Sequence, residues 1–284
     1  ISLDGENNVY ITGYDDIDGW TNSDIFVSKY NNPEKRNSAD ARYPVWTKTL
    51  DTSEDSVPTD ITSSNDGSIY ITSNNLDPNR YNISVNGSDG YDTIAEYNQI
   101  SKFSADGEDE WTVKHNEIVK RDDYEQHITT DREGSLYVGS GYGYGSPKLS
   151  KYDSDGNNEW SREIGEKGQF SVKAITTGRN GNIYISGDAF NDIDGNLVEG
   201  YKDVFISEYD IDGNRIWSDL VGSNSDAPFN SYEEVFESMS SYSDGSLYIL
   251  GNTYPDQLSI SKFTVPQAEP TYSVNTSEIV LDSV

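Results

Sequence analysis

The apolar and aromatic residues of the chain fall into short runs separated by glycine, asparagine, aspartate and serine, and one kind of run recurs five times. Each copy places a tyrosine among aliphatic residues, as in Val9-Tyr10-Ile11. The copies occupy residues 9–13, 69–73, 136–139, 183–187 and 247–251, about 60 residues apart. Because none of the runs is long and none has a helical period, the pattern predicts a repeated all-β unit.

Each tyrosine run is predicted to be the second strand of a hairpin. The first strand centres on the residue nine positions before the tyrosine, which is Ile1, Ile61, Ile128, Ile175 or Met239. Turn-forming pairs separate the two strands in four copies: Asp66-Gly67, Glu133-Gly134, Asn180-Gly181 and Asp244-Gly245. Pairs of this kind favour the positive φ that a tight hairpin requires.

A second hairpin follows in each unit. Its first strand ends in the runs 26–30, 100–103, 149–152, 205–209 and 260–263. A turn on Asp106-Gly107, Asp155-Gly156 or Asp212-Gly213 then leads to a tryptophan eight residues after the preceding aromatic: Trp111, Trp160 or Trp217. In the first unit sixteen residues separate Tyr30 from Trp46, which indicates an insertion in this turn.

Four short antiparallel strands per unit, with apolar residues on both faces, are typical of propeller blades. We therefore expect an all-β fold, a β-propeller of five four-stranded antiparallel blade repeats over residues 1–265, with the first and last blades incomplete. Ile1 stands midway through a first strand, and no Asp-Gly-to-Trp strand follows Phe263. A solenoid of hairpins is the structural alternative.

The composition changes after the last repeat, where Pro266 and Pro270 arrive. Residues 266–284 are expected to form a linker and the start of a following β domain. A segment upstream of Ile1 could complete both terminal blades and close a five-bladed ring. Ile1 would then lie beside the fifth repeat.

Charge narrows the range of partners. The chain has 20 Lys and Arg residues against 50 Asp and Glu, a formal net charge of −30, so phosphate backbones and anionic membranes would repel it. No apolar run approaches the ~18 residues of a membrane-spanning helix. The absence of cysteine excludes disulfides and thiol chemistry. We expect no nucleic-acid partner and no membrane insertion.

In the sequences of their strands and turns the repeats resemble a known family, the bacterial β-propeller repeats called SBBP repeats. The resemblance rests on residues 4–30, above all Asp24-Ile25-Phe26-Val27-Ser28-Lys29-Tyr30, and on residues 151–160, and it covers nearly all of residues 1–265. It implies an extracellular or cell-surface module within a long multidomain chain, and it carries over no catalytic residues. The second unit departs from the family pattern by a long insert, and the first by its extended turn.

Two matched loops, which join the hairpins of the first and fourth units, carry closely spaced carboxylates. The residues are Asp16, Asp18 and Asp24 in the first loop and Asp192, Asp194 and Asp203 in the second. Carboxylates two residues apart before a glycine can wrap Ca²⁺, although the full EF-type loop is absent. The alternative is a turn held by its own backbone hydrogen bonds.

A ligand surface is expected on the same loops, because variable loops on a rigid scaffold commonly carry binding sites. Trp20 lies in the acidic loop of the first unit, where an exposed indole could stack on a sugar. The insert at 74–99 is the longest of these loops, and its candidate ligand-binding residues are Tyr81, Asp89, Tyr91 and Asp92. A decorative excursion of the chain, and an indole folded onto its own blade, are the alternatives.

The remaining motifs offer little catalytic chemistry. His115 and His127 have no neighbouring ligand motif, and the glycine-rich run 141–145 lacks the lysine of a phosphate loop. We therefore expect a non-catalytic extracellular interaction or structural module of a larger bacterial surface, adhesive or filament-forming protein. Its partners would be other domains or subunits of a surface assembly. A lectin-like, polysaccharide-binding propeller is the alternative, and a carbohydrate-active enzyme is a third hypothesis.

Overall fold

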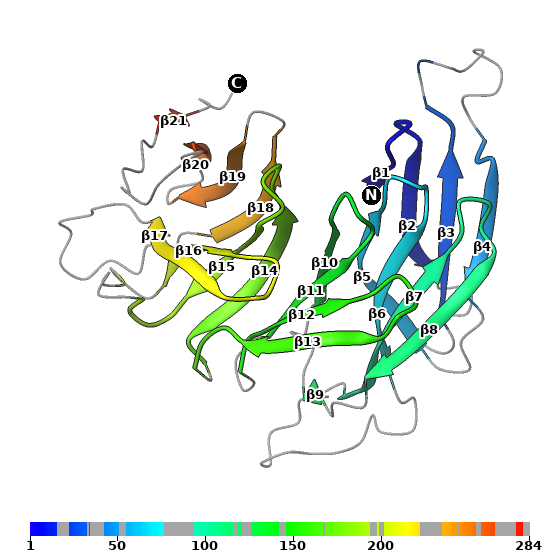
Figure 1. The fold of residues 1–284 in the computed structure, drawn as a ribbon, viewed down its shortest axis with the longest axis horizontal. Helices are drawn as coiled ribbons and strands as arrows, with labels where there is room; N and C mark the ends of the chain where they lie inside the picture. Colours follow the sequence, from blue (N-terminus) through cyan, green and yellow to red (C-terminus); the bar gives the residue numbers. More distant parts are fainter. Residues whose placement is uncertain are drawn as a thin grey trace. The chain divides into compact units, whose positions relative to one another are not determined.

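The computed structural model of the chain is all-β, and its strands form five antiparallel sheets (Figure 1). The described residues are 1–15, 23–32, 34, 43–50, 55–76, 94–115, 119–120, 126–141, 146–166, 168–193, 198, 202–221, 235–242, 245–253, 257–264 and 277–280. Among them no helix is long and apolar enough to cross a membrane.

Each sheet is a meander in which consecutive strands are hydrogen-bonded neighbours. The first sheet contains β1 (Ser2–Leu3), β2 (Val9–Asp15), β3 (Asp24–Tyr30) and β4 (Trp46–Leu50). The second contains β5 (Asp55–Ser63), β6 (Ile69–Leu76), β7 (Ile94–Phe103) and β8 (Asp109–His115), with the short β9 (Val119–Lys120) paired to β7. The third contains β10 (Gln126–Thr130), β11 (Leu136–Ser140), β12 (Lys148–Tyr152) and β13 (Asn158–Glu163).

The last two sheets repeat this order. The fourth contains β14 (Phe170–Thr177), β15 (Ile183–Ala189), β16 (Asp203–Tyr209) and β17 (Arg215–Val221). The fifth contains β18 (Val235–Ser241), β19 (Ser246–Thr253), β20 (Gln257–Thr264) and β21 (Ser277–Val280). The predicted repeat of four-stranded antiparallel sheets is therefore confirmed, whereas closure of the sheets into a ring stays a prediction.

The turns form as their sequences predict. The glycines of the seven turn pairs named in the sequence analysis all have positive φ, between 78° at Gly213 and 88° at Gly134. In each four-residue turn the glycine N–H donates to a carbonyl three residues earlier, as Gly156 does to Asp153 at 3.1 Å. These turns fix the register of both hairpins in each sheet.

The fifth sheet differs from the expectation that the last blade lacks its fourth strand. Residues 277–280 pair antiparallel with β20, in the register Ser259↔Val280 to Lys262↔Ser277. Without this pairing the outer edge of β20 would present unpaired N–H and C=O groups, which a returning segment can satisfy. The first sheet does begin with a shortened strand, the two-residue β1. The domain boundary after residue 265 stays a prediction, since residues 265–276 lie outside the described part.

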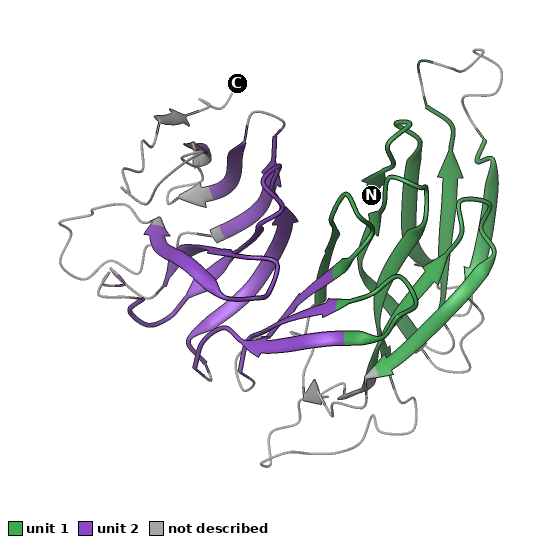
Figure 2. Ribbon diagram, viewed as in Figure 1, with its two compact units in different colours: residues 1–136, 152–158 green, residues 137–151, 159–284 purple. Residues whose placement is uncertain are grey.

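The chain divides into two compact units, coloured separately in Figure 2. Unit 1 comprises residues 1–136 and 152–158, and unit 2 comprises residues 137–151 and 159–284. The core of unit 1 is a buried cluster from the first two sheets: Tyr10, Val27, Ile61, Ile69, Ile71 and Phe103. In unit 2 the rings of Phe170 and Phe205 stack 4.7 Å apart within a larger cluster.

The repeated tyrosines lie in these cores. Tyr10, Tyr70, Tyr137 and Tyr184 are at most 2 % exposed, as the repeat predicts, and Tyr248 is only partly buried. The tryptophans of the fourth strands are also only partly buried. This strand is the outer one of its sheet, and a turn glycine of the next repeat packs against the indoles of Trp46, Trp111 and Trp160.

Candidate functional site

The acidic loops are only partly within the described residues. Asp16, Asp18 and Asp194 lie outside them, whereas Asp24 begins β3 and Asp203 begins β16. Asp203 is 3 % exposed. Among the described residues no group of three or more Asp, Glu or His side chains is arranged to hold a metal ion.

Asp192 shows the contacts of a turn. Its carboxylate accepts the backbone N–H of Val198 at 2.9 Å, and its carbonyl accepts the side-chain amide of Gln169 at 3.0 Å. Such contacts agree with the alternative reading of the acidic loop as a backbone-stabilised turn. Calcium binding by either loop stays a prediction.

The predicted ligand-binding residues Trp20, Tyr81, Asp89, Tyr91 and Asp92 all lie outside the described residues. Their role in binding is therefore still a prediction. Recurring polar contacts among the described residues lie instead at the opposite ends of the hairpins, where the Asp-Gly turns contact the repeated lysines and tryptophans.

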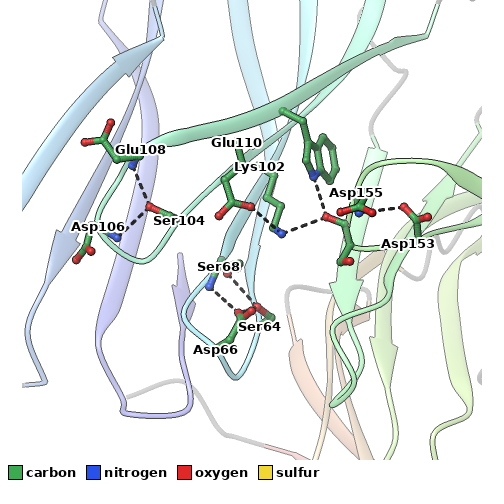
Figure 3. Close-up of polar contacts among 12 residues, drawn as sticks. Ser64, Asp66, Ser68, Lys102, Ser104, Asp106, Glu108, Glu110, Asp153 and Asp155 are labelled. Carbon is green, nitrogen blue, oxygen red and sulfur yellow. Dashed lines mark hydrogen bonds and ion pairs between the residues drawn. The ribbon is translucent and has the colours of Figure 1, made fainter.

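A lysine and a tryptophan of the second sheet converge on one carbonyl of the next turn. Lys102 Nζ donates to the Ser154 carbonyl at 3.1 Å, and the Trp111 indole N–H donates to the same oxygen at 2.9 Å. Lys102 also forms an ion pair with Glu110 at 2.8 Å (Figure 3). Burial lowers the pKa of Lys102, but Glu110 and the neighbouring groups raise it by more, so the amine stays charged.

The same arrangement occurs one repeat earlier. Lys29 Nζ and the Trp46 indole N–H both donate to the Ala105 carbonyl, at 3.0 and 3.3 Å. In each case the lysine also lies over the buried tyrosine of its own sheet, with Nζ 5.3 Å from the Tyr10 ring centre and 5.6 Å from that of Tyr70. We call this arrangement of lysine, tryptophan and turn carbonyl a turn junction.

The glycine of each contacted turn completes the junction. A Cβ atom added to Gly107, Gly156 or Gly213 would lie 3.0 Å or less from the tryptophan of the preceding repeat. Those tryptophans are Trp46, Trp111 and Trp160, respectively. The glycine is thus needed twice, for its positive φ and for the close approach of the indole.

The turns that carry these glycines are held by hydrogen bonds between residues of the same turn. Asp153 accepts the backbone N–H of Asp155 at 3.0 Å, and the Ser104 hydroxyl accepts those of Asp106 and Glu108 at 3.3 and 3.2 Å (Figure 3). Hydrogen bonds from Asn157 hold the pKa of Asp153 below its ordinary value. These residues stabilise turns.

The fourth sheet replaces the junction lysine by Glu208. Its carboxylate is buried and accepts the Tyr184 hydroxyl at 2.7 Å and the Asn182 amide at 2.6 Å. The Trp217 indole N–H donates to its second oxygen. Burial and the contact with Glu208 raise the pKa of Tyr184. Here the tryptophan binds within its own sheet rather than to a following turn.

One carboxylate–imidazole pair lies on the first strands of neighbouring sheets. Asp60 accepts the backbone N–H of Ile128 at 2.9 Å, and its Oδ2 lies 3.9 Å from His127 Nδ1. Burial raises the pKa of Asp60 more than the Ile128 N–H and the His127 charge lower it. The hydrogen bond ties β5 to β10, so the carboxylate has a structural role even without a substrate.

Unit 2 contains a cavity of about 490 Å³ at the contact between β13 and the turn before β17. Its lining includes Arg162 and Glu163 of β13, Glu166, Ile193, Tyr209 and Arg215. These residues were not grouped in the sequence analysis. The signal that could have done so is the pair Arg162 and Arg215, which follow Trp160 and Gly213, respectively, by two residues.

Comparison with known proteins identifies no family. No protein-family model matches the chain, and no curated protein matches it. Among solved structures, prolyl oligopeptidase B from Galerina marginata aligns over 99 % of this chain and 34 % of its own, with a TM-score of 0.50 and 11 % identity. This chain therefore spans about a third of that peptidase.

Two further structures align over most of both chains. A protein of unknown function from Bacteroides caccae covers 89 % of each chain, with a TM-score of 0.42 and 12 % identity. An exo-1,5-alpha-L-arabinanase from a bovine ruminal metagenomic library covers 95 % of each, with a TM-score of 0.41 and 14 % identity. At 11 % identity the alignment with the peptidase bears on the fold alone, and the two structures with TM-scores below 0.5 are likenesses from which nothing further follows.

Proposed function

We propose that this chain is a non-catalytic interaction and structural module of a larger bacterial surface, adhesive or filament-forming protein. We further propose that its repeats belong to the SBBP type and close into a five-bladed ring outside the cell. Its partners would be other domains or subunits of the same surface assembly.

The observation that carries the proposal is the use of the recurring polar residues. In the first two repeats the recurring lysine and tryptophan donate to a carbonyl of the next turn, as Lys102 and Trp111 do to Ser154. The turn carboxylates accept backbone N–H groups, as Asp153 does. Residues that recur because they join repeats serve rigidity, and a rigid acidic array is suited to presenting its variable loops to partners.

Two experiments test the proposal. Antibodies raised against the purified chain should label intact producing cells, and external protease should remove the signal. Labelling that requires permeabilised cells would contradict the extracellular role. In parallel, the chain should turn over neither chromogenic peptides nor polysaccharides. Turnover that Asp60→Asn abolishes, while Asp106→Asn leaves it intact, would contradict the non-catalytic role.

Polysaccharide binding is the second candidate function, and the cavity in unit 2 is the observation that favours it. Its volume of about 490 Å³ falls in the range of small-ligand sites, and it combines apolar with charged side chains. Binding of this kind is compatible with a non-catalytic surface role.

A further inference from the structure

At the Trp46–Gly107 junction two charged positions face each other. One follows the tryptophan by two residues, and the other follows the glycine by two residues. They are Lys48 and Asp109, whose Nζ and Oδ2 atoms lie 3.4 Å apart. Opposite charges therefore meet at this junction, whereas the corresponding positions at the Trp111–Gly156 junction hold Val113 and Asn158.

At the Trp160–Gly213 junction the same two positions hold Arg162 and Arg215. Both arginines line the cavity of unit 2. The positions that hold an ion pair at the Trp46–Gly107 junction are thus occupied by two arginines beside this cavity.

Arg162 is held in position by its neighbours. Its guanidinium carbon lies 5.4 Å from the Trp160 ring centre, and its Nη1 donates to the Ser161 carbonyl at 3.2 Å. A Cβ added to Gly213 would lie 3.0 Å from Arg162 Cγ, so the stem of the side chain packs on the turn. A guanidinium ordered in this way loses little conformational entropy when it binds an anion.

The remaining lining supplies both apolar and polar groups. Ile164 and Ile193 are at most 5 % exposed and Tyr209 is 3 % exposed, so they form an apolar floor. Glu163 and Glu166 stand on the same rim and can accept hydrogen bonds from hydroxyl groups. An apolar floor, hydroxyl acceptors and two cations together suit a sugar ring that carries an acid group.

We propose that this cavity binds an acidic saccharide unit, with its carboxylate or sulfate between the guanidinium groups of Arg162 and Arg215. Guanidinium forks bind such oxyanions through paired hydrogen bonds. The net charge of −30 opposes a long polyanion, so short acidic oligosaccharides should bind better than the polymer. The inference deepens the second candidate function, because it names the class of saccharide that the same cavity would bind, and it does not depend on the module role.

Isothermal titration calorimetry with trigalacturonic acid tests the proposal, and galactotriose is the neutral control. We expect the acidic trisaccharide to bind and the neutral one to bind at least tenfold more weakly. Arg162→Gln and Arg215→Gln should each weaken binding by tenfold or more. Arg179→Gln makes the same charge change at an exposed turn of unit 2 and should leave binding unchanged.

Three results would overturn the proposal. Wild-type protein that binds no acidic oligosaccharide at millimolar concentration has no such site. Equal loss of affinity in Arg179→Gln would reduce the effect to net charge. Inorganic sulfate that binds as tightly as the trisaccharide would leave an anion site without saccharide recognition. If Arg162→Gln fails to fold, Arg215→Gln carries the test, and Arg215→Lys should bind with intermediate affinity. The cell-surface labelling experiment is unaffected by any of these outcomes.

Discussion

The junction between the second repeat and the following turn can be tested by adding one methyl group. Gly156 has φ +84°, and a Cβ there would lie 3.0 Å from the Trp111 ring. Gly134 has φ +88°, and a Cβ there would meet nothing within 4 Å. Gly156→Ala and Gly134→Ala therefore impose nearly the same backbone strain, and only the first crowds an indole.

The expected loss of unfolding free energy in each variant follows from the backbone strain and from the crowding of the indole. Alanine in a left-handed conformation costs about 1–2 kcal/mol, and both variants incur this cost. Overpacking against the indole adds about 1–3 kcal/mol in Gly156→Ala only. The loss of unfolded-state entropy is the same for both substitutions and cancels in the comparison. Gly156→Ala should thus be the less stable variant by about 1–3 kcal/mol.

Urea unfolding followed by tryptophan fluorescence and by circular dichroism measures the difference, provided that the two signals change together. In a Trp111→Ala background the additional cost of Gly156→Ala should disappear, because the crowded ring is gone. Equal destabilisation of the two glycine variants would refute the reasoning. So would an extra cost that persists without Trp111.

Three further predictions concern charge. Burial raises the pKa of Asp60, so the contribution of this group to stability is present at low pH and is lost as pH rises from about 4 through the folded-state pKa. The unfolding free energies of wild type and Asp60→Asn, measured against pH, should therefore converge or cross as the pH rises. In Asp4, hydrogen bonds from Asn8 and Tyr10 outweigh burial and lower the pKa of the carboxyl group. Asp4→Asn should therefore cost the most unfolding free energy above pH 4 and progressively less below it. A difference between wild type and variant that does not change with pH would contradict either assignment. If the acidic loops bind calcium, a chelator should lower the melting temperature of the wild type and added calcium should restore it. The melting temperature of Asp24→Asn/Asp203→Asn should respond to neither addition. A wild-type melting curve that is unchanged by both additions would leave the loops as turns.

The strand order and the turn glycines could be predicted because both depend on local sequence. Asp155-Gly156 indicates a hairpin by itself, and the structure gives that glycine its positive φ. The contact of the same glycine with Trp111 could not be predicted, because it depends on which face of a repeat the next repeat covers. The regular spacing shows that the units are alike, but it does not show how they pack.

Departures from the repeat were visible in the sequence, but their consequences required the structure. Glu208 stands where other repeats have lysine, and only the geometry shows that it accepts the Tyr184 hydroxyl and the Trp217 indole. Pro266 and Pro270 mark the end of local regularity, yet the pairing of residues 277–280 with β20 is a long-range contact. That Arg162 and Arg215 line one cavity depends in the same way on the register between repeats.

The central claim is that consecutive repeats pack side by side as blades, and the absence of cysteine makes a direct measurement possible. Ser2 Oγ and Ser63 Oγ lie 2.8 Å apart on β1 and β5 of neighbouring sheets, so Ser2→Cys/Ser63→Cys should oxidise to a disulfide, detected by mass spectrometry of the intact chain. Ser207→Cys/Ser218→Cys joins directly paired residues within one sheet, whose hydroxyl oxygens are also 2.8 Å apart, and serves as the control. Oxidation of both pairs is the result that the blade packing predicts. Free thiols at positions 2 and 63, with the control pair oxidised, would contradict it.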